Sequence, residues 1–452
     1  MTKRFFGTDG IRGKVNTPPV TTDFFFKLAK AINVFINKKE KKKVFIGRDT
    51  RESGQILEDS LLNAFKSDGV DCYLLGIVST PIVSFMTKYC YADIGLMISA
   101  SHNQFEDNGI KIFKNNGEKL TDKEELQLEN IILRSEESNF CSSQNNIYKA
   151  EDLSPYYKKI LSLTKLNKLI LNRKIVVDCA NGSLYKIAPE ILSRVGLEVI
   201  VKNNCPDGRN INKKCGALYP KALSQSVINH RADVGIAFDG DGDRLIMCDQ
   251  NGVIIDGDKI MAITCKSLLN QKKLKGNAIV GTHMSNIGLD EFLGKSKIKL
   301  FRSDIGDRYV VEMMKKNNCN FGGEQSGHFI YSDYSSTGDA LLSALQILAS
   351  LEIEKKTIEE ILQDYQTYPQ ILINLKTSRD PEDLLQNENV KDYIKHCNLK
   401  DKKNQPLILI RKSGTERLLR VMVQSRSIKL TNETKNDLMK IIFKLDKTCQ
   451  EI

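Results

Sequence analysis

The sequence predicts a multidomain α/β protein that ends in an α+β layer. The chain has 452 residues, which exceeds one ordinary core and suggests three or four domains. Up to about residue 368, short apolar runs alternate with amphipathic segments, a pattern typical of sheets covered by helices. Beyond residue 369, strand-like and helix-like segments follow one another without this rhythm, which favours an α+β layer.

The apolar pattern divides the chain into four units: 1–150, 151–255, 256–368 and 369–452. We expect a helix at 56–65, a surface connection at 135–146, a helix at 340–349 and a helix at 435–445. The apolar stripe of the helix at 340–349 should consist of Leu341, Leu342, Leu345 and Leu348. Strands are expected at 44–46, 72–75, 96–98, 174–178, 278–280, 371–373, 407–410 and 419–423.

The most informative segment is an acidic loop that carries Asp239, Asp241 and Asp243. It follows the apolar run 234–238, so the carboxylates should lie at the C-terminal end of a buried strand. Three like charges repel unless a cation neutralises them, and oxygen ligands favour Mg²⁺. An EF-hand is excluded by spacing, because its glycine would fall on Arg244 and its glutamate on Gln250. The alternative is a solvated acidic turn.

A second loop, Ser-Ala-Ser-His-Asn at 99–103, follows another strand-like run at 93–98. A hydroxyl at a strand end suits a nucleophile or a phosphate carrier. The hydrolase signature Gly-x-Ser-x-Gly is absent, and loop serines often bond only to backbone. Beside a Mg²⁺ site, however, this loop becomes a candidate for a phosphoserine.

Two further loops predict an anionic, sugar-like ligand. Residues 321–328 place a carboxylate, an amide and a hydroxyl between glycines, which suits a polyhydroxylated molecule. Residues 411–417 combine an arginine fork with a Ser-Gly-Thr turn, a good phosphate cradle. The alternatives are a polar turn for the first loop and a basic hairpin turn for the second.

Composition limits the possible partners and the compartment. The net charge of +11 suits an anionic ligand, but the lysines lie in short exposed runs without aromatic interleaving, so we expect no nucleic-acid binding. The 11 cysteines show no metal-ligand spacing, and several, such as Cys72, Cys179 and Cys248, lie in apolar runs typical of buried free thiols. No apolar stretch reaches membrane-spanning length, and we expect a cytoplasmic protein without a secretory segment or a membrane partner.

Taken together, these loops resemble those of the α-D-phosphohexomutases, most closely the phosphoglucosamine mutase branch. Further matching motifs lie at 6–13, 47–51, 107–111 and 306–309, so the resemblance extends from about residue 5 to about residue 424. Assignment to this branch rests mainly on Gln325, where the phosphomannomutase/phosphoglucomutase branch usually has Met. The resemblance implies three similar α/β domains and a smaller C-terminal domain around one central cleft.

The resemblance also implies a mechanism. Ser101 would carry a phosphoryl group, and one Mg²⁺ would bind to it and to Asp239, Asp241 and Asp243. Glucosamine 6-phosphate and glucosamine 1-phosphate would interconvert through glucosamine 1,6-bisphosphate, which also serves as activator, and so supply UDP-N-acetylglucosamine and cell-wall synthesis. Further catalytic candidates are Arg12, His102 and Lys111, and substrate-binding candidates are Arg244, Glu324, Ser326, His328, Arg411, Ser413, Gly414 and Thr415. A homodimer is compatible with this assignment.

The chain departs from the family in the phosphate cradle. Lys412 and Arg417 replace two prolines of the usual motif, which should loosen the turn by increasing backbone freedom. The rival functions are a phosphomannomutase/phosphoglucomutase, a Mg²⁺-dependent sugar phosphatase and a noncatalytic sugar-phosphate sensor. A phosphatase would more naturally use an aspartyl nucleophile, and a sensor would be expected to have lost Ser101 or one of the three aspartates.

Overall fold

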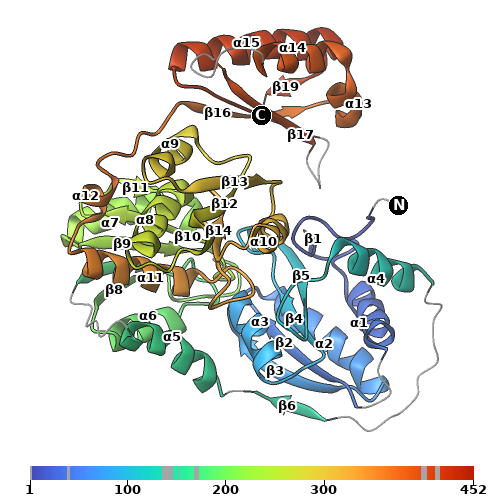
Figure 1. Ribbon diagram of the computed structural model, residues 1–452. Helices are drawn as coiled ribbons and strands as arrows, with labels where there is room; N and C mark the ends of the chain where they lie inside the picture. The colour runs from blue at the N-terminus through green and yellow to red at the C-terminus, as the bar shows by residue number, and fades with distance from the viewer. Residues whose placement is uncertain are drawn as a thin grey trace.

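The computed structural model describes residues 3–37, 41–134, 146–150, 152–166, 173–398, 405–412 and 418–451. Three α/β bodies and a separate C-terminal sheet make up the molecule (Figure 1). Most of the predicted connection at 135–146 and the cradle residues Ser413, Gly414 and Thr415 lie outside the described residues.

The first sheet has six strands in the order β1-β5-β4-β2-β3-β6. Its strands are β1 (Ile11–Lys14), β2 (Lys43–Arg48), β3 (Asp71–Ile77), β4 (Ile94–Ile98), β5 (Asp107–Lys114) and β6 (Ile147–Lys149). The accompanying helices are α1 (Thr22–Ile36), α2 (Ser53–Ser67), α3 (Thr80–Tyr89) and α4 (Asp122–Arg134). The helix expected at 56–65 is the central part of α2.

The second sheet has the order β11-β10-β9-β7-β8 and the third the order β13-β12-β14-β15. The second unit comprises α5 (Ser154–Leu166), β7 (Lys174–Asp178), α6 (Ile187–Arg194), β8 (Glu198–Lys202), α7 (Pro220–His230), β9 (Val234–Phe238), β10 (Leu245–Asp249) and β11 (Ile254–Ile255). The third comprises α8 (Gly257–Asn270), β12 (Ala278–Thr282), α9 (Ile287–Lys295), β13 (Lys299–Ser303), α10 (Asp307–Lys316), β14 (Phe321–Gly323), β15 (Phe329–Tyr331), α11 (Ala340–Glu354) and α12 (Ile358–Leu362).

The three sheets repeat one topology that the sequence does not show as internal identity. In each sheet, three parallel strands are followed by one antiparallel strand: β3-β2-β4 with β5, β8-β7-β9 with β10, and β13-β12-β14 with β15. The loop between the last parallel strand and its antiparallel neighbour holds the predicted site residues at 99–103, 239–244 and 324–328. Each loop therefore leaves the C-terminal end of a parallel strand, the usual ligand-binding edge of such sheets.

The C-terminal unit is an antiparallel sheet in the order β17-β18-β16-β19. Its strands are β16 (Gln370–Lys376), β17 (Leu407–Lys412), β18 (Leu418–Gln424) and β19 (Gln450–Glu451). Its helices are α13 (Pro381–Gln386), α14 (Glu388–Asn398) and α15 (Ile428–Leu445), so the helix predicted at 435–445 begins earlier, at Ile428. Helices α14 and α15 lie on the side of the sheet that faces away from the other domains (Figure 1). The predicted fold class is confirmed.

Helix α11 ties the second and third units together. The predicted stripe Leu341, Leu342, Leu345 and Leu348 is buried, but so is nearly every other residue from Ala340 to Leu351. The helix is enclosed because it packs on α8 of its own unit and on α5 and β10 of the preceding one.

Cys72, Cys179 and Cys248 are buried free thiols, as expected. Among the described residues, no helix has both the length and the apolarity that a membrane crossing requires.

Candidate active site

The acidic loop between β9 and β10 is the point where the three α/β units meet. Gly242 O accepts a backbone hydrogen bond from Ala340 N, where α11 begins. Asp241 O accepts one from Thr80 N, at the start of α3, and the Thr80 hydroxyl donates to the Asp241 carboxylate. On the next strand, Leu245 N donates to Gly327 O at 2.9 Å. The loop is therefore held by backbone contacts from both neighbouring units.

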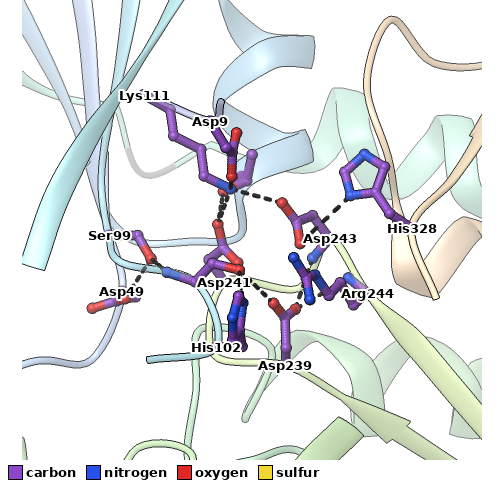
Figure 2. A network of polar contacts seen from close by, with 12 residues as sticks. Asp9, Asp49, Ser99, His102, Lys111, Asp239, Asp241, Asp243, Arg244 and His328 are labelled. Carbon is purple, nitrogen blue, oxygen red and sulfur yellow. Dashed lines mark hydrogen bonds and ion pairs between the residues drawn. The ribbon is translucent and has the colours of Figure 1, made fainter. Parts of the chain in front are cut away.

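Asp239, Asp241 and Asp243 point into one buried cluster (Figure 2). One carboxylate oxygen of each lies within 4.8 Å of the others. Asp239 Oδ1 accepts hydrogen bonds from Asp243 N and Arg244 N, both at 3.1 Å. Burial, and then the charges of Asp243 and Asp241, raise the pKa of Asp239 well above its ordinary value.

Ser101 lies directly beside this cluster. Its Oγ donates a hydrogen bond to Asp239 Oδ2 at 2.8 Å and lies 3.4 Å from His102 Nδ1. The serine is fully buried, and its φ of 53° lies in the left-handed region that residues other than glycine and asparagine rarely adopt. Ser99 and Ser101 therefore differ in their surroundings: the Ser101 hydroxyl donates to Asp239 of the acidic loop, whereas the Ser99 hydroxyl donates to Asp49.

Lys111 comes from β5 and places its ammonium group among the carboxylates. Lys111 Nζ lies 2.7 Å from Asp241 Oδ2, 2.7 Å from Asp243 Oδ2 and 3.1 Å from Asp9 Oδ2. Burial alone would lower the pKa of Lys111, but the charges of Asp241, Asp243 and Asp9 outweigh it and hold the pKa well above the ordinary value. The lysine is therefore a fixed positive charge in this geometry.

The donor set fits a hard divalent cation. Asp241 Oδ1 and Asp243 Oδ1 are buried and accept no hydrogen bond from the residues that the structure describes, although the His328 imidazole lies 3.7 Å from Asp243 Oδ1. Buried carboxylate oxygens without partners are costly, and coordination to a metal ion would satisfy them. The three aspartates could hold such an ion, and Ser101 Oγ is hydrogen-bonded to one of them, Asp239.

Two arginines and a histidine surround Ser101 and the triad. Arg12 ion-pairs with Asp9, and its Nε is buried without a hydrogen-bond partner among the described residues. Burial alone would lower the pKa of Arg244, but Asp243 and Asp239 raise it above the ordinary value. Burial, and then the charges of Arg244 and Arg12, lower the pKa of His102 to about 3. His102 is therefore neutral at physiological pH, and so low a pKa makes its imidazole a weak base.

The structure adds charged residues that the sequence reasoning did not select. Lys119 ion-pairs with both Asp9 and Asp307, so it connects the first unit to the third. The Lys111 and Lys119 charges, together with Arg12, hold the pKa of Asp9 well below its ordinary value even though burial acts in the opposite direction. Asp9 and Asp307 lie in the motifs at 6–13 and 306–309, so those matches were the available signal.

The third loop approaches the acidic loop from the β14–β15 hairpin. Glu324 is buried, and its Oε1 accepts a hydrogen bond from Gly306 N at 3.0 Å. His328 pairs with Arg244 through an isolated β-bridge, and its imidazole lies 3.7 Å from Asp243 Oδ1 and 3.4 Å from Asp307 Oδ2. These carboxylates raise the pKa of His328 against the effect of burial. Ser326 is exposed at the tip of the hairpin.

The C-terminal sheet contributes two neighbouring arginines. Arg411 on β17 is the register partner of Arg420 on β18. Burial, and then the charge of Arg420, lower the pKa of Arg411, while the charge of Glu324 acts in the opposite direction. Like charges on facing strands are destabilising unless an anion neutralises them. Sequence reasoning missed Arg420 because it treated 419–423 only as a strand. Lys412, in place of a proline, ion-pairs with Glu382 at 3.3 Å.

Gln325 forms a contact between the third and fourth units. Its Nε2 donates to Gln370 Oε1 at 2.9 Å, and Gln370 Nε2 donates to Met284 O at 2.9 Å. The side chain that distinguishes the two branches of the family therefore meets the beginning of β16.

Comparison with known proteins matches the three α/β units one by one. Profiles of the phosphoglucomutase/phosphomannomutase family match alpha/beta/alpha domain I at residues 3–139, domain II at 154–252 and domain III at 256–368. A Brucella ovis protein named phosphoglucosamine mutase is 43% identical over 448 residues, which is 98% of each chain. An Allorhizobium ampelinum protein of the same name is 42% identical over 447 residues, again 98% of each chain.

Solved structures share the fold at low sequence identity. A phosphoglucomutase/phosphomannomutase family protein from Burkholderia thailandensis has a TM-score of 0.79 at 20% identity and covers 98% of this chain and 97% of its own. The Aspergillus fumigatus N-acetylphosphoglucosamine mutase, in complex with GlcNAc-6P and magnesium, has a TM-score of 0.65 at 18% identity and covers 96% of this chain and 95% of its own. With three matching domain profiles and full-length relatives above 40% identity, the chain belongs to the phosphoglucomutase/phosphomannomutase family of α-D-phosphohexomutase enzymes.

Proposed function

We propose that this enzyme is a phosphoglucosamine mutase that interconverts glucosamine 6-phosphate and glucosamine 1-phosphate through a phosphoserine at Ser101. The observation that carries the mechanism is the 2.8 Å hydrogen bond between Ser101 Oγ and Asp239 Oδ2, inside a buried triad of carboxylates. The name shared by the full-length relatives supports the amino-sugar substrate.

Asp239, Asp241, Asp243 and an oxygen of phosphorylated Ser101 would hold one Mg²⁺. When bound, such an ion neutralises charge on a transferring phosphoryl group and polarises it. The Aspergillus fumigatus relative was solved with magnesium, which supports this choice of ion. Lys111, Arg12 and Arg244 would offset the remaining negative charge on the phosphoryl oxygens, because phosphoryl transfer depends mainly on positioning and electrostatics.

The reaction needs a group that accepts the proton of the attacking sugar hydroxyl. His102 is the candidate that the geometry favours, since its Nδ1 lies 3.4 Å from Ser101 Oγ, and the charge of a bound phosphoryl group would offset the neighbouring arginines that now disfavour its protonation. Lys111 is held in its charged form by three carboxylates and would serve electrostatics instead. Phosphoserine would transfer its phosphoryl group to the sugar phosphate, and the resulting glucosamine 1,6-bisphosphate would reorient and return the other phosphoryl group to Ser101.

Both orientations of the sugar require one set of binding groups. Arg411, Ser413, Gly414 and Thr415 would hold the phosphate that does not react, and Arg420 would add a second positive charge. Glu324, Ser326 and His328 would bind ring substituents. Soluble sugar phosphates as substrates and buried free thiols both agree with a cytoplasmic enzyme.

A coupled assay with purified enzyme, Mg²⁺ and catalytic 1,6-bisphosphate tests the proposal. Glucosamine 6-phosphate should have the highest kcat/KM, with residual activity on glucose 6-phosphate and less on mannose 6-phosphate. Ser101→Ala should abolish turnover and leave the folded protein intact. Preference for glucose or mannose phosphate would favour a phosphoglucomutase/phosphomannomutase. Release of inorganic phosphate without isomer formation would favour a sugar phosphatase.

A further inference from the structure

We propose that Ser99, Asp49 and Arg51 act as positioning residues, forming a clamp that holds Ser101 in its left-handed conformation. This inference rests on the proposed role of Ser101 as the phosphoryl carrier. It also assigns a task to the motif at 47–51, for which no role follows from the fold alone. The clamp consists of buried hydrogen bonds to the backbone on both sides of Ser101.

The first part of the clamp is a relay through the Ser99 hydroxyl. Ser101 N donates to Ser99 Oγ at 2.8 Å, and Ser99 Oγ donates to Asp49 Oδ2 at 2.6 Å. A hydroxyl has one proton to donate, so the Ser99 proton is committed to Asp49. Ser99 is completely buried, and its hydroxyl bonds to Asp49 and not to Asp239, in contrast to the hydroxyl of Ser101. The two serines of Ser-Ala-Ser therefore have different roles: one positions and the other reacts.

The second part is the guanidinium of Arg51, which is the largest fully buried side chain of the described protein. Arg51 Nε donates to Asp49 Oδ2 at 2.9 Å. Its Nη2 donates to Ser101 O at 3.0 Å and Asn103 O at 2.8 Å. Its Nη1 donates to Asp107 O at 3.1 Å and also to Gln104 O. One buried planar group thus fixes four carbonyls of the loop, a task that a lysine ammonium cannot reproduce.

The second unit adds a contact that fixes Ser101 relative to the acidic loop. Asn212 Nδ2 donates to Ser101 O at 2.8 Å and to Asn103 O at 3.0 Å. Gly240 packs so closely that a Cβ there would lie 2.7 Å from Ser101 O. Thr50, within the same motif, donates to Asn181 O at 2.6 Å. Both sides of the unfavourable φ angle at Ser101 are therefore constrained, as expected where backbone strain serves a function.

The physical consequence concerns the reacting atom. Without the relay, the Ser101 backbone would be free to relax towards ordinary φ values, and Oγ would leave the side of the carboxylate cluster. Fewer molecules would then hold the nucleophile where transfer occurs, which lowers kcat. Binding of the sugar phosphate depends on other loops, so KM should change little.

The test compares Ser99→Ala with the control Ser84→Ala. Ser84 is also buried, and its Oγ donates to a backbone carbonyl, Gly117 O at 2.6 Å, but it lies on α3 outside the clamp. We expect Ser99→Ala to lower kcat and the rate of Ser101 phosphorylation by 1,6-bisphosphate about fivefold to tenfold, the effect of losing one hydrogen bond. KM should stay within about twofold, as expected if ground-state binding is unchanged. Ser84→Ala should lose comparable thermal stability but keep its kcat.

Arg51→Lys provides an independent variant, because it keeps the charge beside Asp49 and loses most of the carbonyl contacts. If it folds, kcat should fall further than in Ser99→Ala. A kcat of Ser99→Ala equal to that of Ser84→Ala would overturn the clamp, whatever the behaviour of Arg51→Lys. If the clamp fails this test while the wild-type enzyme still forms phosphoserine and turns over, only the clamp is wrong and the proposed function stands. Wild-type enzyme without phosphoserine would overturn the proposed function and the clamp together.

Discussion

Adding Mg²⁺ should raise the thermal stability of this protein, and Asp239→Asn should remove most of that rise. A ligand that binds only the folded state at 100 times its Kd stabilises by about 2.7 kcal/mol. For a cooperative unit of about 250 residues, this corresponds to a rise in Tm of about 5 °C. The triad is assembled only when β9 and its loop are folded, so binding to the unfolded chain should be weak.

Asp239→Asn removes the negative charge of this ligand without disturbing the hydrogen bonds that shape the acidic loop. In Asp239→Asn, the amide oxygen can still accept from Asp243 N and Arg244 N, so the loop should keep its shape. Replacing one of the three charged ligands by a neutral amide should weaken binding by at least about 100-fold, because loss of an outer-shell partner alone costs about 10- to 100-fold. At the same Mg²⁺ concentration, the stabilisation then falls to about 0.4 kcal/mol or less. Differential scanning fluorimetry with and without Mg²⁺ measures the change in Tm for both proteins.

Asp249→Asn is the matched control. Asp249 is buried, and its Oδ1 also accepts from two backbone N–H groups, those of Asn251 at 3.0 Å and Val253 at 2.8 Å, but it lies outside the triad. Its Mg²⁺-dependent shift should equal that of the wild type. A full shift in Asp239→Asn, or a lost shift in Asp249→Asn, would refute the assignment of the metal to the triad.

Three further predictions concern stability and substrate binding. Burial, and then the charge of Asp256, raise the pKa of Asp258 to about 7. Below about pH 4 this carboxyl is protonated in both the folded and the unfolded protein, so its contribution to stability is complete. As the pH rises through 7, the unfolded protein already carries the carboxylate and the folded protein must ionise a buried group, so the contribution is lost. Asp258→Asn should therefore raise the unfolding free energy at pH 8, by at most about 4 kcal/mol, and leave it nearly unchanged at pH 4; urea titrations at both pH values check the sign. Arg411→Lys should raise KM for the sugar phosphate about tenfold, because the planar fork is lost; an unchanged KM in steady-state assays would contradict the cradle. Gln325→Met should reduce the preference for glucosamine 6-phosphate over glucose 6-phosphate if the amide contacts the ligand; if kcat falls equally on both substrates, the amide acts through its hydrogen bond to Gln370 instead.

The sequence predicted much of the fold because its strands are short, apolar and followed by polar loops. The strand 234–238 and the acidic loop after it were recognisable from the change between apolar and charged residues. The threefold repetition of β4–β5, β9–β10 and β14–β15 could not be recognised by comparing the segments with one another, because each pair preserves its topology and not its residues; only the family resemblance implied three similar domains. The full burial of α11 was also missed, since an apolar stripe does not report a second neighbouring domain.

Site residues that are close together in the sequence could be predicted, whereas partners that are far apart in the sequence could not. Asp239, Asp241 and Asp243 were evident because like charges so close in sequence require neutralisation. Long-range partners gave no such signal: Lys119 lies 188 positions from Asp307 along the chain, and their ion pair exists only in the folded protein. The sequence placed Arg51 only within the matching motif at 47–51, and its complete burial is evident only in the folded protein.

The most direct test of the account follows the phosphoryl group itself. Enzyme labelled with ³²P at Ser101, freed of excess bisphosphate, is mixed with one equivalent of glucosamine 6-phosphate and quenched within one turnover. We expect the label to leave Ser101 and to appear in glucosamine 1,6-bisphosphate and then in glucosamine 1-phosphate, with none in inorganic phosphate. Label released as inorganic phosphate, label that maps to Ser99, or label that remains on the protein while glucosamine 1-phosphate forms would contradict this mechanism.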